Sequence, residues 1–416
     1  ADGIVGPHAE KEGSYYTIKE VWCPVQLTWN DVEKGELTLS NQYNFVNLKD
    51  CRFSYRLLQM PAMGSTQVKV LKQGNLSSPD VAPGKEAQVK IPMMANADAV
   101  EIKAVNHEGE EIMTWSKGVK SEERRVKNSS APSTSSAAYA DQADAVEVKA
   151  GGRTYRFAKK DGRLMGVEVG SKAISLSNGP RFMAARRSDR SLDQFYNHDD
   201  KEAEKKKTLY TEFVDQGAFA GFEWKEAEAK LVATYQHGSL DEVDWQFLSD
   251  GSVAVTCHYN FGGVVDMMGM AFDYPESKVR SKAWVGNGPY RVWQNREQGP
   301  QYGYWQNDYN DPIPAESWDY PEFKGYFANV KWMQFKTDEG KIGFSGLTAD
   351  EHMGVYTPRD GRDGLLYTLP QTGLAVFKVI PSVRNKVNTT DLNGPSAQPK
   401  WLNGKGKVEF TLNFEL

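Results

Sequence analysis

The stretch Glu36-Leu37-Thr38-Leu39-Ser40-Asn41 decides the fold class, because apolar and polar side chains alternate along it with the period of a half-buried strand. Similar β-forming segments, separated by turn residues, occur on both sides of it between Lys19 and Val119. They are Val21–Trp29, Phe53–Leu58, Gln67–Leu71, Gln88–Ile91, Ala99–Val105 and Glu111–Trp115. Seven short strands over about 100 residues predict an immunoglobulin-like β-sandwich of the fibronectin kind, without the Cys…Trp…Cys arrangement.

A change of composition follows this first domain, which we expect to span residues 19–127. Ser, Ala and Pro dominate residues 128–144, and such residues bury too little surface to fold, so we expect a linker there. Strand patterns resume at Ala145 and continue to Leu416. The only helical candidate is Asp199–Thr208, which is charged throughout and lacks an apolar face. We therefore expect an all-β chain whose large second domain, 145–416, packs two extended sheets face to face.

Charge and cysteine content exclude several classes of function. The 416 residues carry a net charge of -5, and the basic runs Arg124–Lys127 and Lys205–Lys207 have acidic neighbours typical of solvated loops, so nucleic acid is not an expected partner. No apolar stretch approaches the roughly 20 residues of a membrane span. Cys23, Cys51 and Cys257 form no C-x-x-C motif; Cys23 and Cys51 could pair, but buried free thiols are the preferred interpretation. Metal-binding and phosphate-binding motifs are absent, so we expect no metal and no cofactor.

Four segments resemble glycoside hydrolase family 2, the β-galactosidase family. Residues 3–25 look like the exit from that family's catalytic barrel, and Glu36–Leu48 is similar to the start of the sandwich that follows. Asn178-Gly179-Pro180-Arg181-Phe182 matches a P-x-F entry to the large terminal domain, although Arg186–Arg190 departs from the sequence usual after it. Gly286-Asn287-Gly288-Pro289-Tyr290-Arg291-Val292-Trp293-Gln294-Asn295-Arg296 resembles G-x-G-P-x-E-x-Y-x-D-R, with Arg291 in place of Glu and Asn295 in place of Asp.

The resemblance implies a β-galactosidase-type supersandwich, similar to the sugar mutarotases, over residues 145–416. It also implies that residues 1–18 lead out of a barrel preceding Gly3, and that this barrel holds the two catalytic glutamates. We therefore expect no catalytic residue in this chain and no hydrolysis by it alone. Its partners would be the barrel of the same polypeptide and a carbohydrate, either a galactoside or a plant oligosaccharide. A periplasmic or extracellular bacterial location is compatible with this, and homo-oligomerisation stays open.

Twelve aromatic residues lie between Tyr290 and Trp332, more than twice the density of the whole chain. Flat rings can stack on a sugar, and amides or arginines can bind its hydroxyls. The candidate sugar-binding residues of this segment are Trp293, Asn295, Arg296, Tyr304 and Trp305. Gln298–Ser317 is rich in Gly, Pro and Asn and predicts a long loop; alternatively, half of the rings fill the core.

A second candidate region is Val387–Pro395, because the resemblance implies a loop that reaches the barrel. Its candidate sugar-binding residues are Asn388 and Asp391; the alternative is an ordinary turn. Three functions remain: an accessory region of a family 2 hydrolase that shapes the active-site wall, a stand-alone carbohydrate-binding module, and a mutarotase-like isomerase. The last would need a histidine such as His258 or His352, for which a core or sheet-face position is the simpler interpretation.

Overall fold

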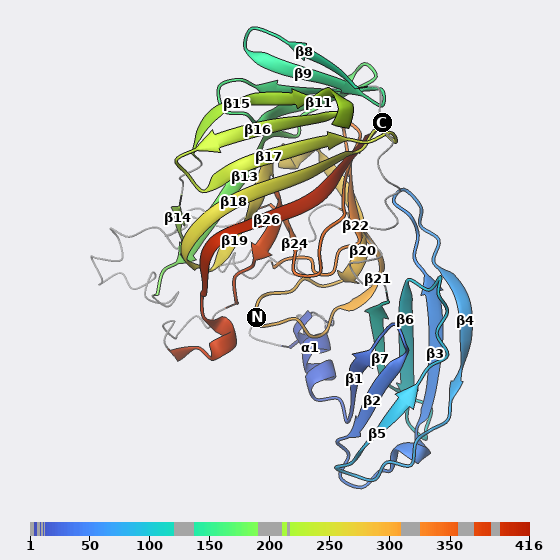
Figure 1. Ribbon diagram of the computed structural model, residues 1–416. Coiled ribbons are helices and arrows are strands. Elements are labelled where there is room, and N and C mark those ends of the chain that lie inside the picture. Colours follow the sequence, from blue (N-terminus) through green and yellow to red (C-terminus); the bar gives the residue numbers. More distant parts are fainter. Residues whose placement is uncertain are drawn as a thin grey trace. The chain divides into compact units, whose positions relative to one another are not determined.

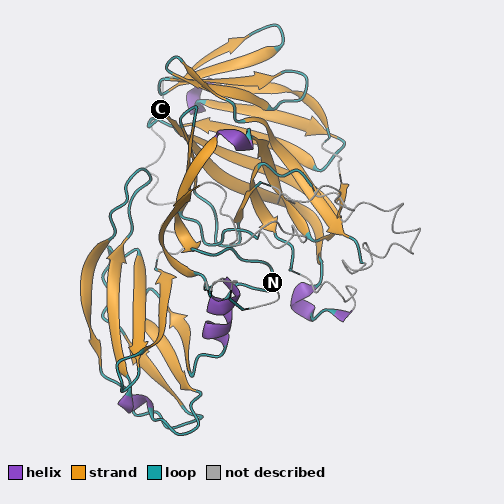
Figure 2. Cartoon of the chain, turned by 180° about the vertical axis from the view of Figure 1, so that it is seen from behind, coloured by secondary structure: helices purple, strands orange, loops and turns teal. Residues whose placement is uncertain are grey.

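The computed structural model describes residues 4–5, 9, 11, 13–119, 137–189, 210–213, 217–308, 325–356, 370–383 and 392–416. It divides into two compact units. The first contains residues 1–129, 284–291 and 297–306, and the second contains residues 130–283, 292–296 and 307–416. Strands dominate both units, and helices are few and short (Figure 2). The expected all-β fold class is confirmed.

The first unit contains a sandwich of two antiparallel sheets, drawn in blue to teal in Figure 1. Its strands are β1 (Val25–Asp31), β2 (Glu36–Asn41), β3 (Arg52–Gln59), β4 (Lys69–Leu76), β5 (Glu86–Lys90), β6 (Ala99–Val105) and β7 (Glu111–Gly118), with a 3₁₀ turn at Leu48–Asp50. One sheet has the order β1-β2-β5 and the other β4-β3-β6-β7. Alternating side chains from both sheets, such as Leu37, Leu39, Phe53, Ile102 and Trp115, form one buried cluster. The seven expected strands are therefore present.

Two asparagines of the segment Glu36–Leu48 hold the loop that follows β2. The buried Asn41 amide donates hydrogen bonds to the carbonyls of Val46 (2.9 Å) and Val81 (2.8 Å). Asn47 Oδ1 accepts from the backbone N–H of Lys49 (3.0 Å) and of Val81 (3.1 Å). Because a buried amide without partners would be costly, its two bonds are needed for Asn41, whereas the partly exposed Asn47 caps the 3₁₀ turn Leu48–Asp50.

The sequence prediction missed the helix α1 (Gly13–Val21) and placed a strand from Val21, whereas β1 begins at Val25. This helix has no buried residue of its own, so the local apolar pattern is weak. Contacts distant in sequence hold it: the Thr17 hydroxyl donates to the Gln298 carbonyl (2.9 Å), and Glu20 accepts from the Gly299 N–H (2.6 Å). Tertiary contacts supply most helical stability in short helices, which explains the miss.

The expected loop over Gln298–Ser317 is also wrong in part, because Gln301–Asp308 forms strand β21. Ser116 on β7 binds this segment twice: its N–H donates to Gln301 Oε1 (2.8 Å) and its hydroxyl to the Tyr302 carbonyl (2.6 Å). These bonds and the pairing of β21 with β20 (Val279–Gly288) thus override the Gly and Asn content that favoured a loop. Residues 309–317 lie outside the described residues, as does the candidate helix Asp199–Thr208.

The second unit contains one long sheet with the order β24-β25-β19-β13-β11-β10-β9-β8, to which β12 and β14 add at the side. Its strands are β8 (Ala138–Asp141), β9 (Ala145–Ala150), β10 (Arg153–Ala158), β11 (Leu164–Val169), β12 (Lys172–Ile174), β13 (Ser177–Arg187), β14 (Tyr210–Phe213), β19 (Met267–Asp273), β24 (His352–Val355) and β25 (Leu374–Val379). Strand β8 occupies residues expected to belong to the linker, and residues 128–136 lie outside the described part. The proposed domain boundaries stay a prediction.

A further antiparallel sheet of this unit has the strand order β15-β16-β17-β18-β26-β23-β22. Its strands are β15 (Ala218–Lys225), β16 (Lys230–Gln236), β17 (Leu240–Phe247), β18 (Val253–Val265), β22 (Trp332–Thr337), β23 (Lys341–Ser345) and β26 (Lys400–Glu415); β20 (Val279–Gly288) begins in this unit and ends in the first. Short 3₁₀ turns lie at Glu226–Glu228, Glu276–Lys278 and Pro395–Ala397. Figure 1 shows the long antiparallel strands β15–β18 beside β26.

Aromatic rings from both sheets meet in the core of the second unit. Phe157 on β10 contacts Trp245 on β17, with 4.8 Å between ring centroids. Trp245 contacts Phe272 on β19 (6.5 Å), and Phe272 contacts Phe410 on β26 (5.9 Å). Edge-to-face packing of buried rings adds to the hydrophobic stabilisation. The two sheets therefore pack face to face, as expected. Among the described residues, none of the helices has the length and apolarity needed to cross a membrane.

Candidate functional site

Three of the predicted sugar-binding residues lie together in the turn 292–296 of the second unit. The N–H of Trp293 donates to the Arg296 carbonyl (3.1 Å), and the N–H of Arg296 donates to the Trp293 carbonyl (3.0 Å). The Arg296 guanidinium carbon lies 5.0 Å from the centre of the Trp293 ring, within the range of a cation–π contact. Trp293 is only 6 % exposed, so this ring is a core side chain and offers little free surface for stacking.

The two residues between them, Gln294 and Asn295, bind the backbone on both sides of the segment 384–391. Asn295 Nδ2 donates to the Val383 carbonyl (2.8 Å), and its Oδ1 accepts from the Val383 N–H (3.0 Å). Gln294 Nε2 donates to the carbonyls of Ser396 (2.8 Å) and Gln398 (2.9 Å). The Asn295 amide is thus occupied by backbone. Gln294 was not among the predicted residues, although it lies between two of them, Trp293 and Asn295.

The candidates Asn388 and Asp391 fall inside that segment and lie outside the described residues. The hydrogen bonds of Gln294 and Asn295 end on the described residues that flank it, Val383 before it and Ser396 and Gln398 after it. The turn 292–296 thus binds described residues on either side of the segment 384–391.

The other two candidates, Tyr304 and Trp305, belong to the first unit and lie on β21. The indole N–H of Trp305 donates to the Gly286 carbonyl (3.1 Å). A Cβ on Gly288 would lie 2.6 Å from the indole, and one on Gly303 would lie 3.2 Å from it. Only glycine leaves room for the ring to lie against the Gly286–Pro289 turn. Trp305 therefore explains Gly288 of the motif and Gly303 on β21, a link that local sequence patterns do not show.

Trp305 remains partly exposed in this position, and Tyr304 is partly exposed beside it in the chain. The Tyr304 hydroxyl donates to Gln306 Oε1 (3.1 Å), and partial burial raises the pKa of this hydroxyl above its usual value. An indole that is fixed at one edge and open at another has the form of a stacking platform for a sugar ring. Of the five candidates described by the structure, Trp305 best meets that requirement.

Tyr290 of the same motif ties the turn to the beginning of the chain. Its ring stacks on Tyr16 of α1 with 5.1 Å between centroids and 28° between planes. Its hydroxyl donates to the Lys11 carbonyl (2.9 Å). The peptide bond between Gly288 and Pro289 is cis, as is the bond between Gly179 and Pro180. These contacts give Tyr290 a structural role within the first unit.

The Asn178–Phe182 motif is structural as well. Phe182 is buried, and a Cβ on Gly179 would lie 2.4 Å from the ring of Phe272. Arg181 forms an ion pair with Asp273 (2.6 Å), and Asn178 Nδ2 donates to the same carboxylate (2.7 Å). The motif thus packs β13 against β19 and contributes no free group for a ligand.

The histidines named in the sequence analysis have different surroundings. His352 begins β24, and desolvation by burial, followed by repulsion from Lys400, lowers its pKa to about 4. His258 lies in the middle of β18, close to Glu242 and Asp244 of β17. The three cysteines are buried and free, as the sequence predicted. In the described part of the chain, the group around His258 is the one set of three residues placed for a metal ion.

The family model for the β-galactosidase small chain matches residues 149–377, and the model for β-galactosidase domain 4 matches residues 37–115. Because the first match alone covers more than half of the chain, the chain belongs to the β-galactosidase small-chain family. Both matched regions are of the carboxy-terminal type of glycoside hydrolase family 2.

Solved structures show only remote similarity. An uncharacterized protein from Listeria monocytogenes, in complex with α- and β-D-glucose, magnesium and calcium, aligns with 9 % identity and a TM-score of 0.21. The cycloalternan-forming enzyme from the same organism, in complex with a pentasaccharide substrate, aligns with 9 % identity and a TM-score of 0.20. In both cases the alignment covers 94 % of this chain and 30 % of the other. A search of curated proteins found no match.

Proposed function

We propose that this chain is the non-catalytic carboxy-terminal portion of a family 2 glycoside hydrolase and that it shapes one wall of the carbohydrate site. The family match supports the enzyme class. The position of Trp305 supports the sugar contact. Its indole is partly exposed, is bound by the Gly286 carbonyl and packs against Gly288 and Gly303. Hydrolysis would belong to the barrel of the same polypeptide, since glycoside cleavage needs a positioned pair of carboxyl groups.

The roles of the remaining candidates follow from their contacts. Tyr304, next to Trp305, would offer its hydroxyl to the sugar. Arg296 lies over Trp293 and would bind a sugar hydroxyl only with its outer N–H groups. Asn295 is a positioning residue, because its amide binds Val383. In this proposal Asn388 and Asp391, which lie outside the described residues, also contact the sugar.

Calorimetric titration of the chain with galactosides and plant-type oligosaccharides tests the sugar contact. A stacked ring contributes about 1 kcal/mol, so W305A should weaken saccharide binding several-fold. W401A is the matched control, because Trp401 is 74 % exposed on β26 and should leave binding unchanged. The parent chain binding no saccharide, or W305A binding as the parent does, would contradict the role of Trp305.

The non-catalytic role has a separate test. The chain should not release nitrophenol from nitrophenyl glycosides. Turnover above background that disappears with one carboxylate substitution in this chain would overturn that part of the proposal. Saccharide binding of equal strength with and without a preceding barrel would favour the alternative of an independent carbohydrate-binding module.

A further inference from the structure

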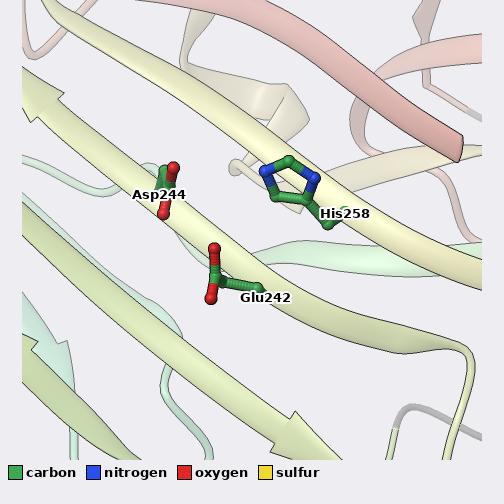
Figure 3. A group of neighbouring side chains, drawn as sticks. All are labelled: Glu242, Asp244 and His258. Atoms are coloured by element: carbon green, nitrogen blue, oxygen red, sulfur yellow. The ribbon is translucent and has the colours of Figure 1, made fainter.

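Glu242, Asp244 and His258 lie on one face of neighbouring strands in the second unit (Figure 3). Along β17, Val243 and Trp245 are buried, so Glu242 and Asp244 point to the opposite face. On β18, the buried Cys257 precedes His258, which is paired directly across from Glu242. Strand register therefore assembles the group from residues 14 and 16 positions apart in sequence.

One atom from each of the three side chains lies within 4.8 Å of the other two. Among the described residues, no hydrogen bond or ion pair involves the side chain of Glu242 or His258, so their ligand atoms are available. A metal ion lies about 2.0–2.2 Å from nitrogen and oxygen ligands. Ligand atoms on one ion are consequently roughly 3–4 Å apart, and small side-chain rotations would close the remaining gap. An imidazole with two carboxylates is a donor set that suits Zn²⁺ and similar transition-metal dications.

The surroundings of Asp244 supply an independent observation. Its Oδ2 accepts a hydrogen bond from Lys230 Nζ (3.2 Å), whereas its Oδ1 is buried and has no partner in the described part of the chain. A buried carboxylate oxygen without a donor is unfavourable, and a cation at that oxygen would remove the penalty. Lys230 cannot neutralise the group alone, because it also pairs with Glu228 (3.5 Å).

Strand β26, which pairs with β18, leaves the local charge negative. Lys407 is paired across from His258, but its ammonium group binds Glu409 (2.9 Å). On β16, which pairs with β17, Thr234 lies across from Glu242 and carries no charge. The local charge is therefore negative, which favours the binding of a dication. The four carboxylates are those of Glu228, Glu242, Asp244 and Glu409, against the two ammonium groups of Lys230 and Lys407.

We propose that Glu242, Asp244 and His258 bind one transition-metal dication of the Zn²⁺ type on the outer face of β17 and β18. Three protein ligands leave a fourth position for water or for an oxygen of another molecule. The ion links β17 to β18, and it gives Asp244 Oδ1 the partner that this atom otherwise lacks. This site is independent of the proposed sugar contact, since none of its residues takes part in that contact.

The test uses the chelator-treated chain titrated with Zn²⁺ alone by calorimetry and with Co²⁺ alone by visible absorption. We expect one ion per chain. Loss of an outer-shell partner already weakens metal binding about 10–100-fold, so H258A and E242Q should each weaken it by at least about 100-fold. H107A is the control, because His107 belongs to the first unit and is exposed.

Circular dichroism and thermal melting separate loss of a ligand from loss of folding. Both variants alter side chains on the outer face of the sheet, so each should fold as the parent does without metal. Added Zn²⁺ should raise the melting temperature of the parent and of H107A and leave that of H258A unchanged. Absence of Zn²⁺ binding by the parent, or unchanged binding by H258A and E242Q, overturns the proposal.

Discussion

Glu339 accepts two hydrogen bonds from Ser175, one from the backbone N–H (2.8 Å) and one from the hydroxyl (2.6 Å). The carboxylate lies in the turn between β22 and β23, whereas Ser175 follows β12, so the pair connects the two sheets of the second unit. Lys278 also binds this carboxylate, and the Tyr274 hydroxyl donates to it (3.0 Å). Desolvation alone would raise the pKa of Glu339, but these donors outweigh it and lower the pKa from 4.5 to about 2.

The first prediction follows from that network. A carboxyl group whose pKa is lower in the folded state stabilises the fold above its unfolded pKa, and the stabilisation is lost as the pH falls toward the folded pKa. The free energy of unfolding should therefore fall between pH 4.5 and about 2, and E339Q should reduce this dependence. Urea unfolding at a series of pH values measures it. D338N is the control, since the Asp338–Arg280 pair is exposed and should contribute little.

His352 predicts a pH dependence in a different range. Burial lowers its pKa from 6.5 to about 4, so the unfolded chain takes up a proton before the folded chain does. Stability should decrease as the pH falls from 6.5 to about 4, and the full penalty should be present below that range. H352Q removes this dependence, whereas H107Q, at an exposed position, should not. An unchanged pH profile for H352Q in urea unfolding would show that His352 is not the group responsible.

The tryptophans of the candidate site should differ in their contribution to stability. Trp293 is 6 % exposed, and removal of a buried aromatic side chain costs about 3–5 kcal/mol. W293A should therefore destabilise the chain strongly. W401A, at a position that is 74 % exposed, should change the free energy of unfolding by no more than about 0.5 kcal/mol. W305A should fall between them. Equal melting temperatures for W293A and W401A would contradict the core position of Trp293.

The cysteines provide a prediction about reactivity. Cys23, Cys51 and Cys257 are 3 %, 2 % and 0 % exposed, and burial raises the pKa of each thiol. Because the thiolate is the reactive form, none should react with Ellman's reagent in the folded chain at neutral pH. All three should react after unfolding in guanidinium chloride without a reductant. A count of one thiol under those conditions would indicate a Cys23–Cys51 disulfide.

Local patterns determined the fold class. The alternation in Glu36–Asn41 and in the six related segments predicted the seven strands of the first sandwich. A strand with one buried face alternates apolar and polar residues, and this pattern can be recognised in the sequence. The Gly286–Arg296 motif indicated the family because its residue types match a family pattern at fixed spacing. The free cysteines also followed from the absence of a pairing pattern.

Tertiary structure decided what those patterns do not contain. Helix α1 forms where Thr17 and Glu20 bind residues 298 and 299, and β21 replaces an expected loop because Ser116 binds Gln301 and Tyr302. The Glu242–Asp244–His258 group requires the register between β17 and β18. Such relationships join residues that are distant in sequence, and they depend on which strands pair and on which side chains the packing buries. Only the folded chain fixes them.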